Sequence, residues 1–277
     1  MIDTRPIGMF DSGIGGLTVA KEVFASMPGE KIIYLGDMAR CPYGGRSEET
    51  IRTFGLQDAR FLMSKDIKML IVACNTVSSV ALDYIQEEIN EIPVIGVVAP
   101  GARAAVSRTV SKRIGILGTV ATIRTRSYEK EIARLDPSIK TYGKACPLFV
   151  PLVEEGITEG DITRLVVQRY VYELVNYGID CLILGCTHYP LLIESIQSAV
   201  GAGIQLLDSA HWTAREAKDI LTAMNIRSSE NASGMEQSSF FVTDMTEGFA
   251  KNALAFLGNP LPNIEKVKLE HLTGTVF

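Results

Sequence analysis

Two segments of this chain resemble each other, and in each an apolar run ends in a cysteine followed by side chains that can hydrogen-bond. The first is Met69-Leu-Ile-Val-Ala-Cys74-Asn75-Thr76, and the second is Cys181-Leu-Ile-Leu-Gly-Cys186-Thr187-His188. Each apolar run is typical of a buried strand. Cys74 and Cys186 lie 112 positions apart. Cysteines at equivalent ends of two similar strands indicate a site with a thiol on each side.

Two thiols across a small cavity could invert a stereocentre. A free thiol has a pKa of about 8.5, close enough to neutrality for it to act as a base or, when protonated, as an acid. One thiol would take a proton from one face of a carbon while the other delivers a proton to the opposite face. The protonation states are then swapped, so the reverse reaction uses the same two groups.

Removing a proton next to a carboxylate needs electrostatic help, because the intermediate carries extra negative charge. Acid–base catalysis contributes about 10²–10⁴-fold, and the rest must come from preorganised donors in a dry cavity. Asp11 could accept a hydrogen bond from a substrate ammonium group or orient Cys74, and His188 could tune Cys186 or donate a proton. The neutral donors expected around a carboxylate are Ser12, Asn75, Thr76, Thr119 and Thr187.

The cysteines also have a structural interpretation. A single free cysteine after a strand is usually a small buried hydrophobic residue. Cys181 lies inside an apolar run and is expected in the core, whereas Cys41 and Cys146 each precede a proline and are expected in loops. Only the matched positions of Cys74 and Cys186 favour a catalytic pair.

The other polar candidates are open to simple interpretations as well. Asp11 and Ser12 could form only a turn and a helix cap. The adjacent Glu154 and Glu155 are typical of a solvated surface, and a lone His188 is more often structural.

The sequence contains incomplete signatures of two kinds of cofactor site. Gly13-Ile-Gly15-Gly16 follows the first predicted strand, but a G-x-G-x-x-G dinucleotide motif requires glycine at position 18, which is Thr18. A zinc site of Cys74, Cys186 and His188 is possible on paper, without the close cysteine pair typical of structural zinc. We therefore expect no cofactor and no metal.

Short apolar runs alternate along the chain with longer amphipathic stretches. Near-continuous Val, Ile and Leu is typical of parallel strands covered on both faces, so the sequence predicts an α/β fold with mostly parallel sheets. The clearest helix is predicted to begin with Asp161 as N-cap and to stop at Gly178, and its buried stripe is Ile162, Val166, Tyr170, Leu174 and Tyr177. Strands are predicted over residues 7–10, 32–35, 70–73, 94–98, 114–117, 182–184, 205–207 and 240–242.

The repeat extends beyond the cysteine segments. Residues 7–12 resemble 114–119, Cys41-Pro42 recurs as Cys146-Pro147, and residues 93–97 resemble 203–207, at offsets of 105 to 112. Apolar strands recur by chance in any βα protein, but the cysteines favour a duplicated α/β unit. We predict two similar domains related by pseudo-twofold symmetry, residues 1–98 plus 210–277 and residues 99–209. Ligands of open α/β sheets bind at the carboxyl ends of strands, so the active site is expected in the cleft between the domains.

Composition limits the class of protein. Apolar residues make up 47% of the 277 positions and charged residues 21%, which is enough for a packed core. The net charge is −5 and no long basic run occurs, which argues against nucleic acid or a membrane as partner. Residues 1–6 lack the apolar core of a signal peptide, and no apolar run approaches the roughly 18 residues of a membrane span. We expect a cytoplasmic protein whose five cysteines are free thiols.

Taken jointly, four motifs resemble the cofactor-independent aspartate/glutamate racemase family, and within it the glutamate racemases. The motifs are FDSGIGGLTV at 10–19, GDMARCPYG at 36–44, ACNT at 73–76 and GCTHYP at 185–190. The resemblance covers nearly the whole chain. It implies interconversion of L- and D-glutamate without pyridoxal phosphate or metal, with D-glutamate entering bacterial peptidoglycan, by a homodimer. Some relatives carry an N-terminal extension used for activation, which we do not expect here because the first strand is predicted at residue 7.

The resemblance also implies roles for single residues. Cys74 and Cys186 would be the acid/base thiols, the first acting on the D-enantiomer and the second on the L-enantiomer. Asp11 would assist near Cys74, and Glu154 (or the adjacent Glu155) and His188 would assist near Cys186. The implied substrate-binding residues are Asp11, Ser12, Pro42, Tyr43, Gly44, Asn75, Thr76, Thr119, Thr187 and His188.

Three alternative functions stay open. A racemase for a related acidic amino acid such as aspartate would differ only in pocket depth. A two-lobed ligand-binding protein without catalysis would not need paired thiols, and a nucleotide-dependent oxidoreductase would need an intact phosphate loop.

Overall fold

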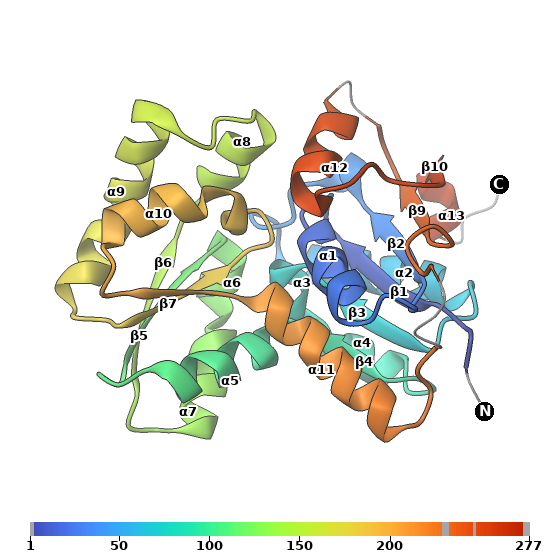
Figure 1. The fold of residues 1–277 in the computed structure, drawn as a ribbon, viewed down its shortest axis with the longest axis horizontal. Helices are drawn as coiled ribbons and strands as arrows, with labels where there is room; N and C mark the ends of the chain where they lie inside the picture. Colours follow the sequence, from blue (N-terminus) through green and yellow to red (C-terminus); the bar gives the residue numbers. More distant parts are fainter. Residues whose placement is uncertain (1–2, 229–232, 246–247, 274–277) are drawn as a thin grey trace.

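The computed structural model describes residues 3–228, 233–245 and 248–273, which form two parallel sheets with helices packed on their faces (Figure 1). The larger sheet has the order β10-β9-β2-β1-β3-β4 and the smaller has β6-β5-β7-β8. All of their described strand pairs are parallel. This confirms the predicted α/β class.

The strands of the larger sheet are β1 Ile7–Asp11, β2 Ile32–Gly36, β3 Met69–Val72, β4 Val94–Gly96, β9 Ser239–Val242 and β10 Ile264–Lys266. Those of the smaller sheet are β5 Arg113–Gly118, β6 Lys140–Ala145, β7 Cys181–Gly185 and β8 Gln205–Asp208. The helices are α1 Leu17–Ser26, α2 Glu48–Met63, α3 Asn75–Val80, α4 Leu82–Glu88, α5 Val98–Arg108, α6 Val120–Thr125, α7 Ser127–Leu135, α8 Phe149–Glu154, α9 Gly160–Asn176, α10 Ile193–Val200, α11 Ser209–Ala223, α12 Phe249–Leu257 and α13 Leu269–Thr273, with 3-10 turns η1 Met38–Arg40 and η2 Tyr189–Leu192.

The repeat in the sequence is a repeat of strand order and register. Four strands of the larger sheet run β2-β1-β3-β4, and the smaller sheet runs β6-β5-β7-β8 in the corresponding order. Ile7 pairs with Met69 in the first copy, and Ile114 pairs with Cys181 in the second. These are the residues that the two sequence copies align. The duplication therefore places Cys74 and Cys186 just beyond the ends of equivalent strands.

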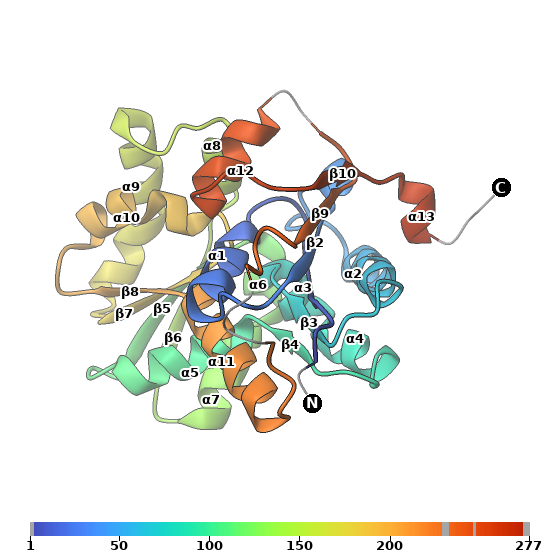
Figure 2. The same cartoon turned by 45° about the vertical axis from the view of Figure 1, so that its right-hand side comes forward.

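Two helices lie where the chain passes between the sheets. Helix α5 follows β4 and precedes β5, while α11 follows β8 and packs against both α1 and α5 (Figures 1 and 2). The predicted division into residues 1–98 plus 210–277 and residues 99–209 falls at the beginnings of these two helices, and it stays a prediction.

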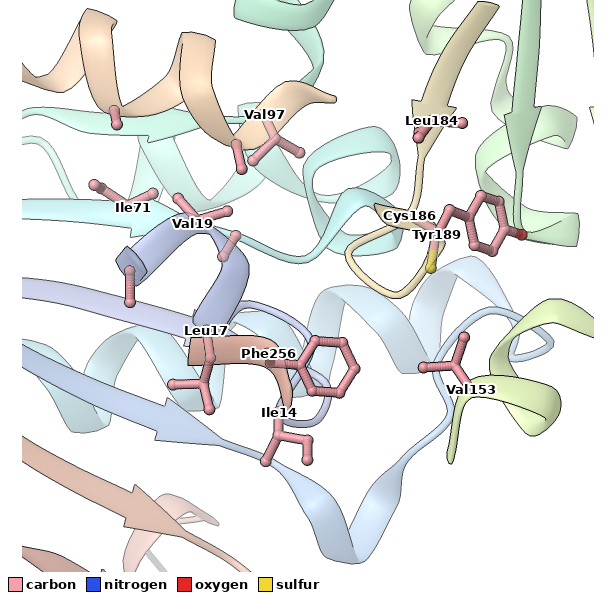
Figure 3. Close-up of a cluster of buried hydrophobic side chains, with 14 of the residues drawn as sticks. Ile14, Leu17, Val19, Ile71, Val97, Val153, Leu184, Cys186, Tyr189 and Phe256 are labelled. Carbon is pink, nitrogen blue, oxygen red and sulfur yellow. The ribbon is translucent and has the colours of Figure 1, made fainter. Parts of the chain in front are cut away.

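One hydrophobic cluster extends from the larger sheet into the smaller. It includes Ile71 of β3 and Leu184 of β7, both fully buried, and Figure 3 shows Cys186 beside Tyr189 within it. Burying each large apolar side chain contributes about 1.5–3 kcal/mol. The cluster therefore joins β3 to the end of β7 that carries Cys186, while Cys74 packs in a second cluster on the larger sheet.

Several predicted details are wrong. Helix α9 has Glu159 as its N-cap, with Asp161 in the first turn, and its inner face is shifted: Ile162 is 60% exposed and Tyr177 is 45% exposed. Gly178, with φ of +66°, ends it as predicted. Strand β4 ends at Gly96, and Val98 already belongs to α5. The residues that α9 buries are Thr163, Val167, Tyr170, Val171 and Leu174.

Two strands, β6 and β10, are absent from the prediction. Both are at sheet edges; β10 is exposed and β6 has no fully buried residue, so neither has an apolar run. None of the helices in the described ranges has the length and apolar character needed to cross a membrane.

Candidate active site

A cavity of about 330 Å³ lies where residues beyond the carboxyl ends of β1, β3, β5 and β7 meet. This is near the lower end of the range of about 300–1,000 Å³ typical of small-molecule sites. Every residue predicted for the site is in its wall: Asp11, Ser12, Pro42, Tyr43, Gly44, Cys74, Asn75, Thr76, Thr119, Glu154, Cys186, Thr187 and His188.

The Cys74 thiol has an acidic and polar environment. Its Sγ lies 3.5 Å from Ser12 Oγ, and the residue is only 4% exposed. Burial and, after it, the negative charge of Asp11 raise the pKa of the Cys74 thiol. The resting thiol is therefore protonated and able to deliver a proton.

The Cys186 thiol has a basic neighbour instead. Its Sγ lies 4.0 Å from His188 Nδ1, and His188 Nε2 lies 3.4 Å from Glu154 Oε1. Burial lowers the pKa of His188, but the interactions with Cys186 and Glu154 and the attraction to Asp11 outweigh burial and raise that pKa to about 10. A protonated imidazole stabilises negative charge on an adjacent sulfur. The two thiols thus have opposite surroundings, one suited to donating a proton and the other to accepting one.

Two buried side chains in the cavity wall have one polar atom committed to protein and one unpartnered. Asp11 Oδ2 accepts hydrogen bonds from Gly16 N at 2.7 Å and Thr187 Oγ1 at 3.2 Å, while Oδ1 has no partner in the described structure. Asn75 Oδ1 accepts from the Tyr128 hydroxyl at 2.7 Å, while Nδ2 has no partner there. Buried polar groups are normally satisfied, so a ligand carrying both a donor and an acceptor fits this wall.

Contacts between the two halves close the other side of the cavity. Thr119 caps α6 through the backbone N–H of Thr122, and its hydroxyl lies 3.1 Å from Thr76 Oγ1. The Gly44 carbonyl accepts a hydrogen bond from Ala121 N at 3.0 Å. A Cβ on Gly44 would lie 2.7 Å from Thr119 Cβ, so this close approach requires glycine.

Tyr43 lines the cavity, but its hydroxyl is committed elsewhere. It donates to Asp37 Oδ2 and also lies 3.0 Å from Asp58 Oδ2. Arg40 pairs with the same two carboxylates, at 2.5 Å to Asp37 and 2.9 Å to Asp58. This buried ionic network holds the segment carrying Pro42 and Gly44, and the predicted site contained neither carboxylate nor Arg40.

Two further cysteines line the cavity. Cys41 and Cys146 lie in loops, as expected, but both are in the wall, and Cys41 Sγ is 3.8 Å from Glu154 Oε1. Burial raises the pKa of both thiols. In the sequence, the repeated Cys-Pro pair is the only feature that points to a place for these two cysteines in the site. Within the described ranges, no group of three or more His, Cys, Asp or Glu residues is placed to hold a metal ion.

The location of Glu154 distinguishes it from its neighbour. Glu154 is in the cavity wall beside His188, whereas Glu155 is not among the residues that line the cavity. Glu154 also remains partly accessible, with 40% of its side chain exposed.

Comparisons with known proteins agree with this architecture. A sequence model of the Asp/Glu/hydantoin racemase family matches residues 18–217. The glutamate racemase of Geobacter metallireducens is 45% identical over 266 residues, which are 96% of this chain and 97% of that protein. The glutamate racemase of Chlorobaculum tepidum is 45% identical over 262 residues, 95% of this chain and 96% of that protein.

Solved structures show the same relationship. The crystal structure of Francisella tularensis glutamate racemase in complex with D-glutamate superposes with a TM-score of 0.90 at 37% identity, covering 97% of this chain and 99% of that one. The Picrophilus torridus aspartate racemase, 17% identical with a TM-score of 0.53, covers 82% of this chain and 96% of its own, and shares the fold alone. The chain therefore belongs to the glutamate racemases of the Asp/Glu/hydantoin racemase family and is an amino-acid racemase, an isomerase.

Proposed function

We propose that this protein interconverts L- and D-glutamate by proton transfer at Cα, with Cys74 and Cys186 as the two bases. The observation that carries the proposal is that thiols at two equivalent strand ends line one cavity with opposite electrostatic surroundings. The same wall offers an unpartnered acceptor, Asp11 Oδ1, and an unpartnered donor, Asn75 Nδ2. An α-amino acid supplies the complementary ammonium and carboxylate groups. Glutamate is named for relatives of this chain at 45% and 37% identity.

In the L-to-D direction, the Cys186 sulfur takes the Cα proton while the His188 imidazolium stabilises the thiolate from which the step begins. The Cys74 thiol delivers its own proton to the opposite face of Cα. Asp11 accepts from the substrate ammonium, and Asn75 donates to the carboxylate as negative charge develops there. The step leaves Cys74 as the thiolate and Cys186 as the thiol, which is the starting state for the D-to-L direction. No electron is gained or lost, so the chemistry requires no redox partner.

The proposal includes a physiological role. D-Glutamate made in the cytoplasm would supply peptidoglycan, and the enzyme would act as a homodimer. Both statements rest on similarity to bacterial glutamate racemases. Rescue of a bacterium auxotrophic for D-glutamate tests the supply role, and sedimentation velocity tests the homodimer.

The reaction is tested most directly in D₂O. The protein is incubated with L-glutamate without added cofactor, and the sample is analysed by proton NMR and chiral chromatography. We expect D-glutamate carrying deuterium at Cα. L-Aspartate is run in parallel. Exchange of aspartate without glutamate would overturn the substrate assignment, and exchange of neither would overturn the two-thiol chemistry.

A further inference from the structure

Tyr128 is a buried tyrosine that contacts the site without lining the cavity. It lies on α7 with no exposed surface, and its hydroxyl donates a 2.7 Å hydrogen bond to Asn75 Oδ1. Asn75 directly follows Cys74 and begins α3. Its Nδ2 is the atom left without a partner in the described structure. The orientation of the Asn75 amide is therefore set from the smaller-sheet half of the chain.

The ring of Tyr128 is fixed between two glycines. A Cβ on Gly101 of α5 would lie 3.3 Å from Tyr128 Cε1, and a Cβ on Gly185 would lie 3.3 Å from Cε2. Gly185 is the last residue of β7 and immediately precedes Cys186. The Ser209 side chain, at the beginning of α11, hydrogen-bonds the same phenol oxygen. Tyr128 thus contacts the residue after one thiol and the residue before the other.

An asparagine amide can present either its oxygen or its nitrogen to a ligand, and the partner of the opposite atom decides which. With the phenol proton donated to Oδ1, the two N–H groups of Nδ2 remain for the ligand. The reversed amide would direct Oδ1 at a carboxylate, which is repulsive. The two glycines confine the ring, so the phenol oxygen stays in one place, and in the observed arrangement its proton is donated to Asn75 Oδ1.

We propose that Tyr128 is a positioning residue that fixes the Asn75 amide so that Nδ2 donates to the substrate carboxylate. This rests on the proposed function, in which that carboxylate belongs to glutamate. Tyr128 itself does not touch the substrate. Its effect is expected in substrate binding more than in proton transfer, because the carboxylate is bound in both the ground state and the transition state.

The test removes only the hydroxyl, with Tyr128→Phe. Without the phenol, Asn75 Nδ2 is no longer held in place to donate to the substrate carboxylate. Loss of a hydrogen bond to a charged group weakens binding about tenfold, so KM for both enantiomers should rise about tenfold. The kcat value should change by less than about threefold. The matched control is Thr163→Val, which removes an equally buried hydroxyl that is bonded to the Ile157 carbonyl at 2.8 Å and lies outside the cavity wall. Its KM should stay within about twofold of the wild type.

A double-mutant cycle separates positioning from general loosening of the fold. Asn75→Ala alone should raise KM, and Tyr128→Phe added to Asn75→Ala should raise it no further, because the amide that Tyr128 orients is gone. An equal increase in both backgrounds, or an unchanged KM in Tyr128→Phe, would overturn the proposal.

The same cycle is measured by calorimetric binding of D-glutamate. This readout continues to work if the wild type binds glutamate but does not racemise it, so failure of the proposed chemistry and failure of the positioning role give different results. Non-additive binding supports the positioning role, and additive binding contradicts it.

Discussion

The Thr187 hydroxyl donates a 3.2 Å hydrogen bond to Oδ2 of Asp11, which lies 176 positions earlier in the chain. Asp11 ends β1 of the larger sheet, and Thr187 directly follows Cys186 beyond β7 of the smaller sheet. The carboxylate whose charge acts on Cys74 is therefore oriented by the residue next to Cys186. This bond also leaves Asp11 Oδ1 as the oxygen available to a ligand.

Replacing either of the two cysteines proposed as bases should separate the two halves of the proposed racemisation, proton removal and proton delivery. The two enantiomers of glutamate have equal free energy, so kcat/KM remains equal in the two directions for any variant. Hydrogen exchange is not bound by that constraint. Cys74→Ala retains Cys186 and should exchange the Cα hydrogen of L-glutamate in D₂O with retention, whereas Cys186→Ala should do so only for D-glutamate.

Racemisation by either variant should fall by about 10²-fold or more, since acid–base catalysis at one face is lost. Proton NMR measures exchange, and chiral chromatography measures racemisation. Normal racemisation by Cys74→Ala, or exchange of the opposite enantiomer, would contradict the assignment of the two thiols.

Glu154→Gln and Glu155→Gln form a matched pair of variants. Removing the Glu154 charge lowers the pKa of His188 and weakens support for a thiolate at Cys186. We expect kcat to fall about tenfold, with little change in unfolding free energy because Glu154 is partly exposed. Glu155→Gln should keep kcat within about twofold, since Glu155 is outside the cavity wall. The reverse ranking in steady-state kinetics would assign the assisting role to Glu155.

His188 should remain protonated well above neutral pH. Its pKa is raised from an unfolded value of about 6.5 to about 10. A raised pKa contributes stability that is fully present below about pH 6.5 and is lost as the pH rises through about 10. The difference in unfolding free energy between wild type and His188→Gln should therefore shrink over this interval.

The titration itself can be followed by histidine NMR. His188 is assigned by comparison with His188→Gln, and the remaining histidines serve as internal references. Titration of the His188 imidazole near pH 6.5 would contradict the assignment of a protonated His188 beside Cys186.

Arg40→Met should be strongly destabilising. Arg40 pairs with buried Asp37 and Asp58, and removing it leaves two carboxylates without their cation. Breaking a buried ion pair costs about 3–5 kcal/mol, which urea denaturation measures as unfolding free energy. The control Arg164→Met removes the exposed pair with Asp161 and should cost less than about 0.5 kcal/mol. Equal effects of the two substitutions would contradict this account of the network.

Much of the fold could be predicted because buried parallel strands have continuous apolar sequences. Strands such as β1 and β7 are buried at every position and leave a clear pattern. The edge strands β6 and β10 have exposed polar residues, so only backbone pairing with a neighbour defines them. The prediction for the inner face of α9 is correct for Tyr170 and Leu174, but Ile162 and Tyr177 are apolar yet exposed, and Thr163, Val167 and Val171 are buried as well.

The site could be predicted where residues directly follow strands, because strand ends converge in a parallel sheet. Asp11, Cys74 and Cys186 are of this kind. Tyr128 and Asp58 reach their partners from the sides of helices, 53 and 15 positions along the chain from Asn75 and Tyr43, so no local motif contains them. Whether such residues reach the site depends on how their helices pack. The spacing of residues in a single sequence does not show that packing.

The duplicated strand order has a consequence for how the activity can be lost. Each sheet supplies one of the two proposed bases, so neither copy of the α/β unit could carry out the proposed reaction alone. The proposed acid–base pair therefore depends on contacts between the copies, such as the hydrogen bond from Thr187 to Asp11. A substitution that weakens those contacts would separate the two thiols without altering either of them.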